Sequence, residues 1–209
     1  MAQITLFRRT AVVAALGLAA CSSKNDATTR DSASGAVAPA PVVTDSSSPA
    51  TAPSSSANAM TDANILAKEK GGDSAEVAIG QFARTHASDP QVKAYAALLV
   101  HDHSKGEKDV VALATKLTVT PQPPANDTTS QETAHTIDHL TALKGYDFDT
   151  AFVHHEIADH QTDIDDAHKA AAAAQNPEVK SLVEKSLPEL QKHLDRAQEL
   201  DKKLSAAKH

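Results

Sequence analysis

The sequence predicts an all-α fold, and three observations support that prediction. Aromatic side chains account for 3% of the 209 residues and tryptophan is absent, so the chain is poor in the residues that strands favour. The hydrophobic share of 41% comes mostly from Ala, Leu and Val, which fill a core only when small side chains pack closely. From Thr61 onward, apolar residues recur with the period of a helix. A bundle of helices satisfies all three observations.

Four long helices and one short helix are expected in the folded part, residues 61–209. Thr61-Asp62 provides an N-cap for the first, and prolines at positions 121, 123 and 124 keep the stretch after the second non-helical. Gly145 is expected to close the short helix. The expected ranges are about 62–86, 90–117, 130–143, 147–174, and 177 to near the C-terminus.

The connection between the second and third long helices identifies the topology. It runs from about Thr118 to Tyr146 and carries the short helix. Such a long crossover is typical of ferritin-like four-helix bundles, whereas up-down-up-down bundles have short loops. Each half also contains a similar turn, Ser88-Asp89-Pro90 in the first and Gln175-Asn176-Pro177 in the second. This echo is either an internal repeat or two independent uses of a common helix start.

Composition excludes several classes of function. A single cysteine excludes a disulfide framework and a cysteine-based zinc ribbon. The formal charge of −7 argues against a nucleic-acid partner. The helical domain has no cysteine for nucleophilic catalysis, and no serine lies in a recognisable nucleophile elbow.

The amino terminus has the layout of a secretory signal. Arg8 and Arg9 precede an apolar run over residues 10–20, which is shorter than the roughly 20 residues that span a bilayer. The run ends in Leu18-Ala19-Ala20-Cys21, which resembles the bacterial lipobox. We therefore expect residues 1–20 to be a signal peptide and Cys21 to be the lipidation site, carrying acyl chains such as palmitate.

The residues after the cysteine predict a membrane-tethered domain. Ser22 stands where an aspartate would favour retention in the inner membrane, so the resemblance implies the periplasmic side of the outer membrane. Residues 21–60 are rich in Ser, Ala, Thr and Pro, a composition typical of a disordered linker. Loss of residues 1–20 removes two arginines and no acid, which leaves 18 basic and 27 acidic side chains and a charge of −9. Membrane attachment is therefore expected through the lipid alone.

The histidines suggest a polar cluster in the core. All eleven follow residue 85, and at about 100° per residue His103 and His160 fall on the apolar faces of the second and third long helices. Glu76 falls on that face of the first helix, and His193 lies at the edge of the face of the fourth. His154 and His155 fall outside these faces and are expected to be solvated.

The chemistry of this cluster leaves two interpretations open. Neutral imidazole and carboxylate suit Zn, Cu, Fe or Ni, so Glu76, His103, His160 and His193 are candidate metal ligands. Asp102, Asp159 and Glu156 are candidates for supporting those ligands. The alternative is a hydrogen-bonded core network without metal, in which His193 is a rim residue.

A ferritin-type di-iron centre is not expected. It requires Glu-x-x-His pairs, whereas Glu156…His160 and Glu189…His193 are spaced by four.

Several landmarks resemble the bacterial domain of unknown function 4142. They are Asp62-Ala63-Asn64-Ile65-Leu66, Gly71-Gly72, Ser88-Asp89-Pro90-Gln91-Val92-Lys93, Val100-His101-Asp102-His103, Ala158-Asp159-His160 and Leu187-Pro188 with His193-Leu194. The resemblance covers residues 61–205. It implies a ferritin-like four-helix protein of the cell envelope, often lipid-anchored, with Glu76, His103, His160 and His193 as characteristic polar positions. It implies no established activity.

Three functions are consistent with these features. The first is an outer-membrane-anchored periplasmic lipoprotein with a non-enzymatic domain that holds a transition metal, or acts as a polar switch, through the His/Glu cluster. The second is an envelope structural or interaction protein, with an unknown protein partner, in which the cluster is only a core network. The third is a metal-dependent enzyme, which would need an open coordination position.

Overall fold

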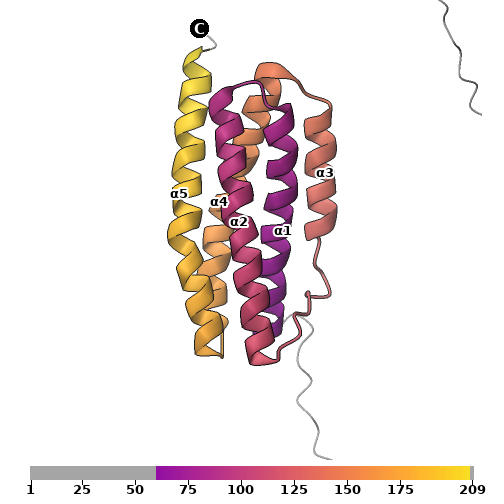
Figure 1. Cartoon of the computed structure of the whole chain (residues 1–209), viewed down its shortest axis with the longest axis vertical. Helices are drawn as coiled ribbons and strands as arrows, with labels where there is room; N and C mark the ends of the chain where they lie inside the picture. Colours follow the sequence, from indigo (N-terminus) through magenta and orange to yellow (C-terminus); the bar gives the residue numbers. More distant parts are fainter. Residues whose placement is uncertain (1–59, 208–209) are drawn as a thin grey trace, which may run out of the picture. The chain divides into compact units, whose positions relative to one another are not determined.

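The structure is a computed structural model that describes residues 60–207. This range contains five helices and no strand, which confirms the all-α prediction (Figure 1). The helices are α1 (Asp62–His86), α2 (Pro90–Leu117), α3 (Thr129–Thr141), α4 (Gly145–Ala173) and α5 (Pro177–Ala207). The expected signal peptide, Cys21 and the linker as far as residue 59 lie outside the described residues.

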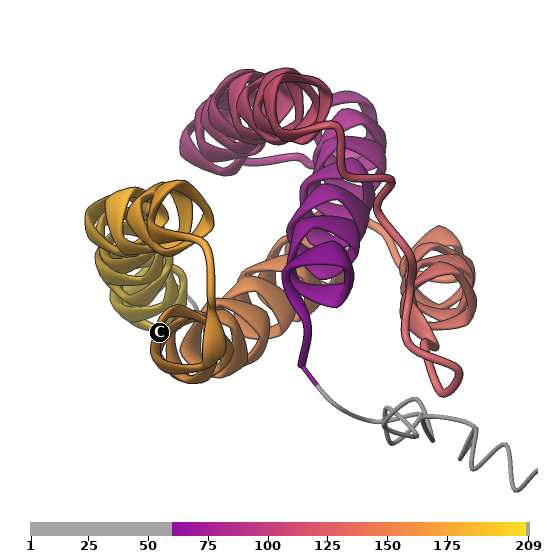
Figure 2. The same cartoon turned by 90° about the horizontal axis from the view of Figure 1, so that it is seen from below.

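Four of the helices form a bundle made of two helical hairpins. Helix α1 packs along α2 and α4 packs along α5, while α3 lies outside the bundle against α1 (Figures 1 and 2). The connection from α2 to α4 carries α3, so the ferritin-like arrangement with a long crossover is confirmed. Among residues 60–207, no helix combines the length and apolar character that crossing a membrane requires.

The sequence places most helix ends correctly. Thr61 forms a capping box with Asn64 at the start of α1, and Asp89 accepts hydrogen bonds from the first backbone N–H groups of α2. The prediction for Gly145 was wrong. The short helix already ends at Thr141, and Gly145 begins α4 with a φ of +61°, a conformation that glycine adopts without steric cost.

The two interhelical turns are held by equivalent contacts, which supports the internal repeat. The carboxylate of Asp149, at the start of α4, accepts hydrogen bonds of 2.8 Å from the backbone N–H groups of Ser88 and Asp89 in the α1–α2 turn. The carboxylate of Asp62, at the start of α1, does the same at 2.9 and 3.0 Å for Gln175 and Asn176 in the α4–α5 turn. Each hairpin therefore fixes the turn of the other.

A polar layer divides the bundle core into two apolar halves. In every long helix, charged or imidazole side chains separate the residues of one half from those of the other. The aromatic half contains Ile79, Ala83, Ala87, Val92, Tyr95, Ala96, Leu99, Leu140, Phe148, Phe152, Val153, Ala197, Leu200 and Leu204. The aliphatic half contains Ile65, Leu66, Val110, Ala114, Ala167, Ala170, Ala171, Val179, Val183 and Leu190. The candidate site lies in the layer between them.

Candidate metal centre

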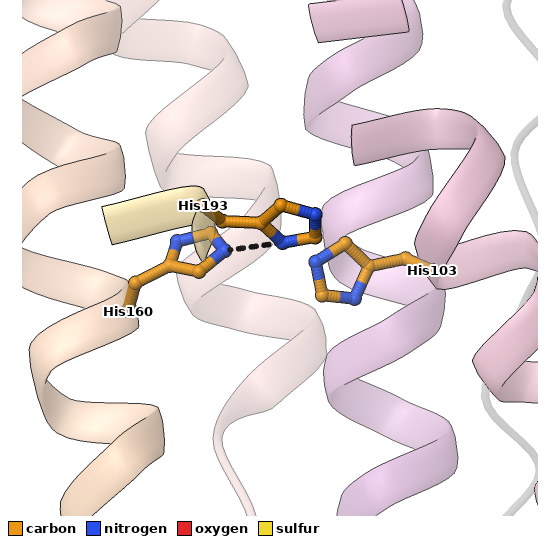
Figure 3. Close-up of side chains that lie close together, drawn as sticks. All are labelled: His103, His160 and His193. Atoms are coloured by element: carbon orange, nitrogen blue, oxygen red, sulfur yellow. Dashed lines mark hydrogen bonds between the residues drawn. The ribbon is translucent and has the colours of Figure 1, made fainter. Parts of the chain in front are cut away.

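Three imidazoles from three helices meet in the polar layer. His103 comes from α2, His160 from α4 and His193 from α5, and their rings point toward one another (Figure 3). The ring centroids are 5.2–5.7 Å apart, and none of the residues is more than 6% exposed. One nitrogen of each ring lies within 4.8 Å of one nitrogen of each of the others.

Carboxylates from other helices hold the outer nitrogens of two of these rings. Nδ1 of His103 lies 2.9 Å from Oδ1 of Asp73 on α1, and Nε2 of His193 lies 3.1 Å from Oδ2 of Asp102 on α2. An ionised carboxylate only accepts hydrogen bonds, so each ring donates its outer N–H. Ligating histidines in proteins are commonly oriented in this way.

The third ring completes the pattern. Nδ1 of His160 donates to the backbone carbonyl of Glu156 at 3.0 Å, and the opposite nitrogen, Nε2, lies 3.3 Å from Nδ1 of His193. Nε2 of His103 is buried and has no hydrogen-bonding partner. All three inner nitrogens thus point into one small volume, while the outer nitrogens are already occupied.

Burial keeps two of the three rings neutral, those of His160 and His193. Desolvation, with the neighbouring His103 and His193, lowers the pKa of His160 to about 3. Desolvation also lowers the pKa of His193 to about 4, although the hydrogen bond to Asp102 opposes this. Burial opposes ionisation of Asp102, yet hydrogen bonds from His101 and His193 lower the pKa of its carboxyl to about 2. At neutral pH the layer therefore offers the neutral imidazoles of His160 and His193, and the ionised carboxylate of Asp102 lies behind His193.

A cavity of about 230 Å³ reaches two of the imidazoles, His103 and His193, from the aliphatic half. The Ala, Val, Ile and Leu side chains of that half are small, and they leave this space between the helices. Acidic side chains outnumber basic ones in its lining, which includes Lys68, Lys105 and Lys185. The acidic residues are Glu69, Asp73, Asp102, Asp109, Asp163, Asp166 and Glu189. Such a lining attracts cations toward the histidines.

Glu76 is not part of the three-histidine group, which corrects its predicted place. It lies in a second group with His155 and Glu156. The reason is its position along the axis of α1. At the level of His103, the residue of α1 that faces the bundle core is Asp73. Glu76 follows Asp73 by three residues, which places it about 4.5 Å further along the helix axis, at the level of Glu156.

The surroundings of the other predicted site residues also differ in part from those expected from the sequence. His193 is 0% exposed and is not a rim residue, and His155, expected in solvent, is half-buried. Asp102 supports His193 rather than the adjacent His103. Asp159 interacts with Glu76, Glu156 and His155.

Two residues near the imidazoles were not predicted, Asp73 and Glu189. Asp73 accepts from His103, and a carboxylate oxygen of Glu189 lies within 4.8 Å of ligand atoms of Asp102 and His193. Neither falls on a clear apolar stripe. Their distances to the histidines depend on how the helices align along one another, and the sequence does not give that alignment.

The chain belongs to the family described as domain of unknown function DUF4142, which it matches over residues 47–200. This confirms the resemblance noted in the sequence. A comparison with curated proteins finds no match.

Two solved structures share the fold. One is the Cu(II)-bound form of CopM, at 16% identity and a TM-score of 0.54, covering 68% of this chain and 98% of CopM. The other is a DUF305 protein from Streptomyces coelicolor described as secreted, at 12% identity and a TM-score of 0.59, covering 70% of this chain and 96% of that one. At these identities the likeness concerns the fold, and neither description names a reaction.

Proposed function

We propose that this chain is an extracytoplasmic, non-enzymatic metal-binding protein in which His103, His160 and His193 hold one transition-metal ion. The observation that carries the proposal is the arrangement of the imidazole nitrogens. Each ring donates its outer N–H to an oxygen acceptor, so a ring without a second proton has a lone pair on its inner nitrogen. Three lone pairs that face one another in a buried volume repel each other unless a cation lies between them.

A proton is a poor candidate for that cation. The low pKa values of His160 and His193 mean that burial opposes a charged imidazole at neutral pH. A single proton between these two rings would also leave Nε2 of His103 without a partner. A metal ion can accept all three lone pairs at once, so the arrangement favours metal over a hydrogen-bonded network alone.

The donor set and the spacing suit a first-row transition metal. Imidazole is a ligand for Zn, Cu, Fe and Ni. Two nitrogens at 2.0–2.1 Å from a tetrahedral ion lie about 3.3 Å apart, and Nε2 of His160 and Nδ1 of His193 are separated by 3.3 Å. CopM, which shares the fold, has a Cu(II)-bound form, and we therefore propose copper as the first metal to test.

The cavity provides a route to two of the imidazoles. It ends at His103 and His193, and its acidic lining would draw a cation from solvent toward the ligands. A domain that exchanges its ion through this route would act as a metal carrier or buffer.

The proposed location rests on the amino terminus. The lipobox-like Leu18-Ala19-Ala20-Cys21, with Ser22 after it, supports a lipid anchor at Cys21 and the periplasmic face of the outer membrane. The linker to residue 60 would tether the bundle to that surface. The membrane, reached through the lipid, is the proposed partner, and nucleic acid is not.

The test compares two histidines of the same helix. The protein, prepared without a polyhistidine tag, is titrated with Cu(II), and bound copper is measured together with nitrogen coupling in its electron paramagnetic resonance spectrum. We expect His160→Asn to lose one equivalent of copper and the imidazole signature. His168→Asn, which changes an exposed residue of α4, should keep both.

Equal copper content and equal spectra in these two variants would contradict the proposal. Helicity and melting temperature of the metal-free variants establish that each is folded. A wild-type melting temperature that does not change on adding copper would also count against it, because a ligand that binds only the folded state stabilises it.

A further inference from the structure

A second group of buried side chains lies in the polar layer, apart from the three imidazoles. Glu76 comes from α1, and His155 and Glu156 come from α4. Glu76 is 2% exposed and Glu156 is 0% exposed. A ligand atom of each of the three residues lies within 4.8 Å of ligand atoms of the other two.

The polar atoms of this group lack partners. Both carboxylate oxygens of Glu76, both of Glu156 and Nε2 of His155 are buried without a hydrogen bond. The nearest cation-forming group to Glu156 is Nδ1 of His160, 3.5 Å from Oε2, and that nitrogen already donates to a backbone carbonyl. Buried polar groups are almost always paired because leaving them unpaired is costly. The carboxyl groups of Glu76 and Glu156 neighbour each other and Asp159, and one ligand atom from each of the three residues faces the same volume. A cation in that volume would pair with all three residues.

A cation is the partner that would let these carboxyl groups ionise. Burial, followed by repulsion from Glu156, raises the pKa of Glu76 well above its usual range. Burial and Asp159 do the same for Glu156. Asp163 also contributes to the raised pKa of both groups. Burial lowers the pKa of His155, so its imidazole is neutral and does not supply the missing positive charge.

We propose that Glu76, Glu156 and His155 form a second divalent-cation site, whose donor set matches Zn(II). Two carboxylate oxygens and one imidazole nitrogen are ligands that Zn(II) accepts, with water or substrate in the fourth position. The ion would satisfy the unpaired atoms and neutralise the two carboxylates.

This site has its own ligands and reaches the surface at its own point on α4. His155 is half-buried, so the group reaches the surface of α4 at that point. Asp159 and Asp163 follow along α4, and Asp163 lines the acidic cavity. The site connects to the three histidines through Glu156, whose backbone carbonyl accepts from His160. It does not depend on the three-histidine site to bind its ion.

The experiment counts bound zinc. The tag-free protein is dialysed against Zn(II), and zinc per chain is measured for the wild type and three variants. The double variant Glu76→Gln/Glu156→Gln keeps side-chain volume and removes both charges. Glu178→Gln/Glu184→Gln removes two exposed glutamates of α5 as the matched control. His103→Asn changes only the three-histidine group.

We expect two zinc ions for the wild type and the control, and one for each of the other variants. A double variant that still binds two ions would overturn the second site. If the double variant loses one ion and His103→Asn loses none, the second site stands and the three-histidine proposal fails. Wild-type protein that binds no zinc overturns the second site as well.

Separate measurements test whether the variants fold. Removing two unpaired buried carboxylates should leave helicity unchanged in the metal-free protein. His155→Asn provides a second variant at a half-buried position and should also lose one zinc ion. Retention of two ions by folded His155→Asn and by the folded double variant would contradict the assignment of these ligands.

Discussion

Nε2 of His160 lies 3.3 Å from Nδ1 of His193, and the opposite nitrogen of each ring is already committed to an oxygen acceptor. The two residues come from the two helices of the same hairpin, and His103 faces them from the other hairpin. The oxygen acceptors fix the tautomer of each ring, because the proton must lie on the outer nitrogen. The inner nitrogens remain able to bind a metal ion.

The carboxylate behind His103 should control metal affinity. Asp73→Asn weakens the acceptor that orients His103, and such changes typically cost 10–100-fold in affinity. We expect that loss for Cu(II), measured by competition with a chelator. Asp165→Asn, at an exposed position of α4, should bind copper as the wild type does. Unchanged affinity in Asp73→Asn would show that His103 is not a ligand.

Gly106 permits the approach of Asp73 to α2. A Cβ at this position would lie 2.7–2.8 Å from the carboxylate oxygens of Asp73, so Gly106→Ala should displace that carboxylate from His103. We expect a loss of copper affinity similar to that of Asp73→Asn. We also expect little change in helicity, because alanine favours a helix more than glycine does.

The double variant Gly106→Ala/Asp73→Asn separates this mechanism from a general packing defect. Its affinity should be close to that of either single variant, because both act through the same contact. Additive losses would contradict the mechanism.

The metal-free protein should lose stability through His160 as the pH falls. The pKa of His160 is about 3 in the folded state and about 6.5 when unfolded. Below pH 6.5 the unfolded chain therefore binds a proton that the folded protein does not. The stabilisation is complete above pH 6.5 and declines toward pH 3.

Urea unfolding of the wild type and of His160→Gln measures this effect. Between pH 7 and pH 5 the wild type should lose about 2 kcal/mol relative to the variant, at about 1.4 kcal/mol per pH unit below 6.5. His168→Gln, changed at an exposed position, should follow the wild type. A difference between wild type and His160→Gln that does not depend on pH would contradict a buried neutral ring.

The turn contacts should contribute strongly to stability. Asp149 is 2% exposed and accepts two backbone hydrogen bonds from the α1–α2 turn. Hydrogen bonds to charged groups contribute about 1.5–3 kcal/mol each, so Asp149→Ala should lower the free energy of unfolding by about 3 kcal/mol. Asp147→Ala removes an exposed carboxylate in the first turn of the same helix and should cost less than about 1 kcal/mol. Equal losses would show that the turn contact is not stabilising.

Much of the fold was predictable because its signals are local. Helical periodicity, the Asx-Pro turns and the cluster of prolines after Leu117 define nearly every helix end. The same periodicity predicts that His103 and His160 point toward the core, because the helical repeat fixes the direction of a side chain relative to its neighbours.

The contacts between helices were not predictable in this way. Periodicity gives the direction of a side chain, whereas its partner depends on how far each helix is shifted along the others. Glu76 has the predicted direction but lies at the level of Glu156, and Asp102 reaches His193 rather than its neighbour. His155 is half-buried although its direction on an isolated helix suggests solvent.

The division of the ligands between the two hairpins has a consequence for folding. His103 belongs to the first hairpin, whereas His160 and His193 belong to the second. Glu76 and Glu156 are divided in the same way. A metal ion at either position would tie together halves that are otherwise joined by one long crossover. The sequence from Thr61 to His209 contains no cysteine, so the bound ion would serve as a reversible cross-link where many exported proteins of this size rely on a disulfide.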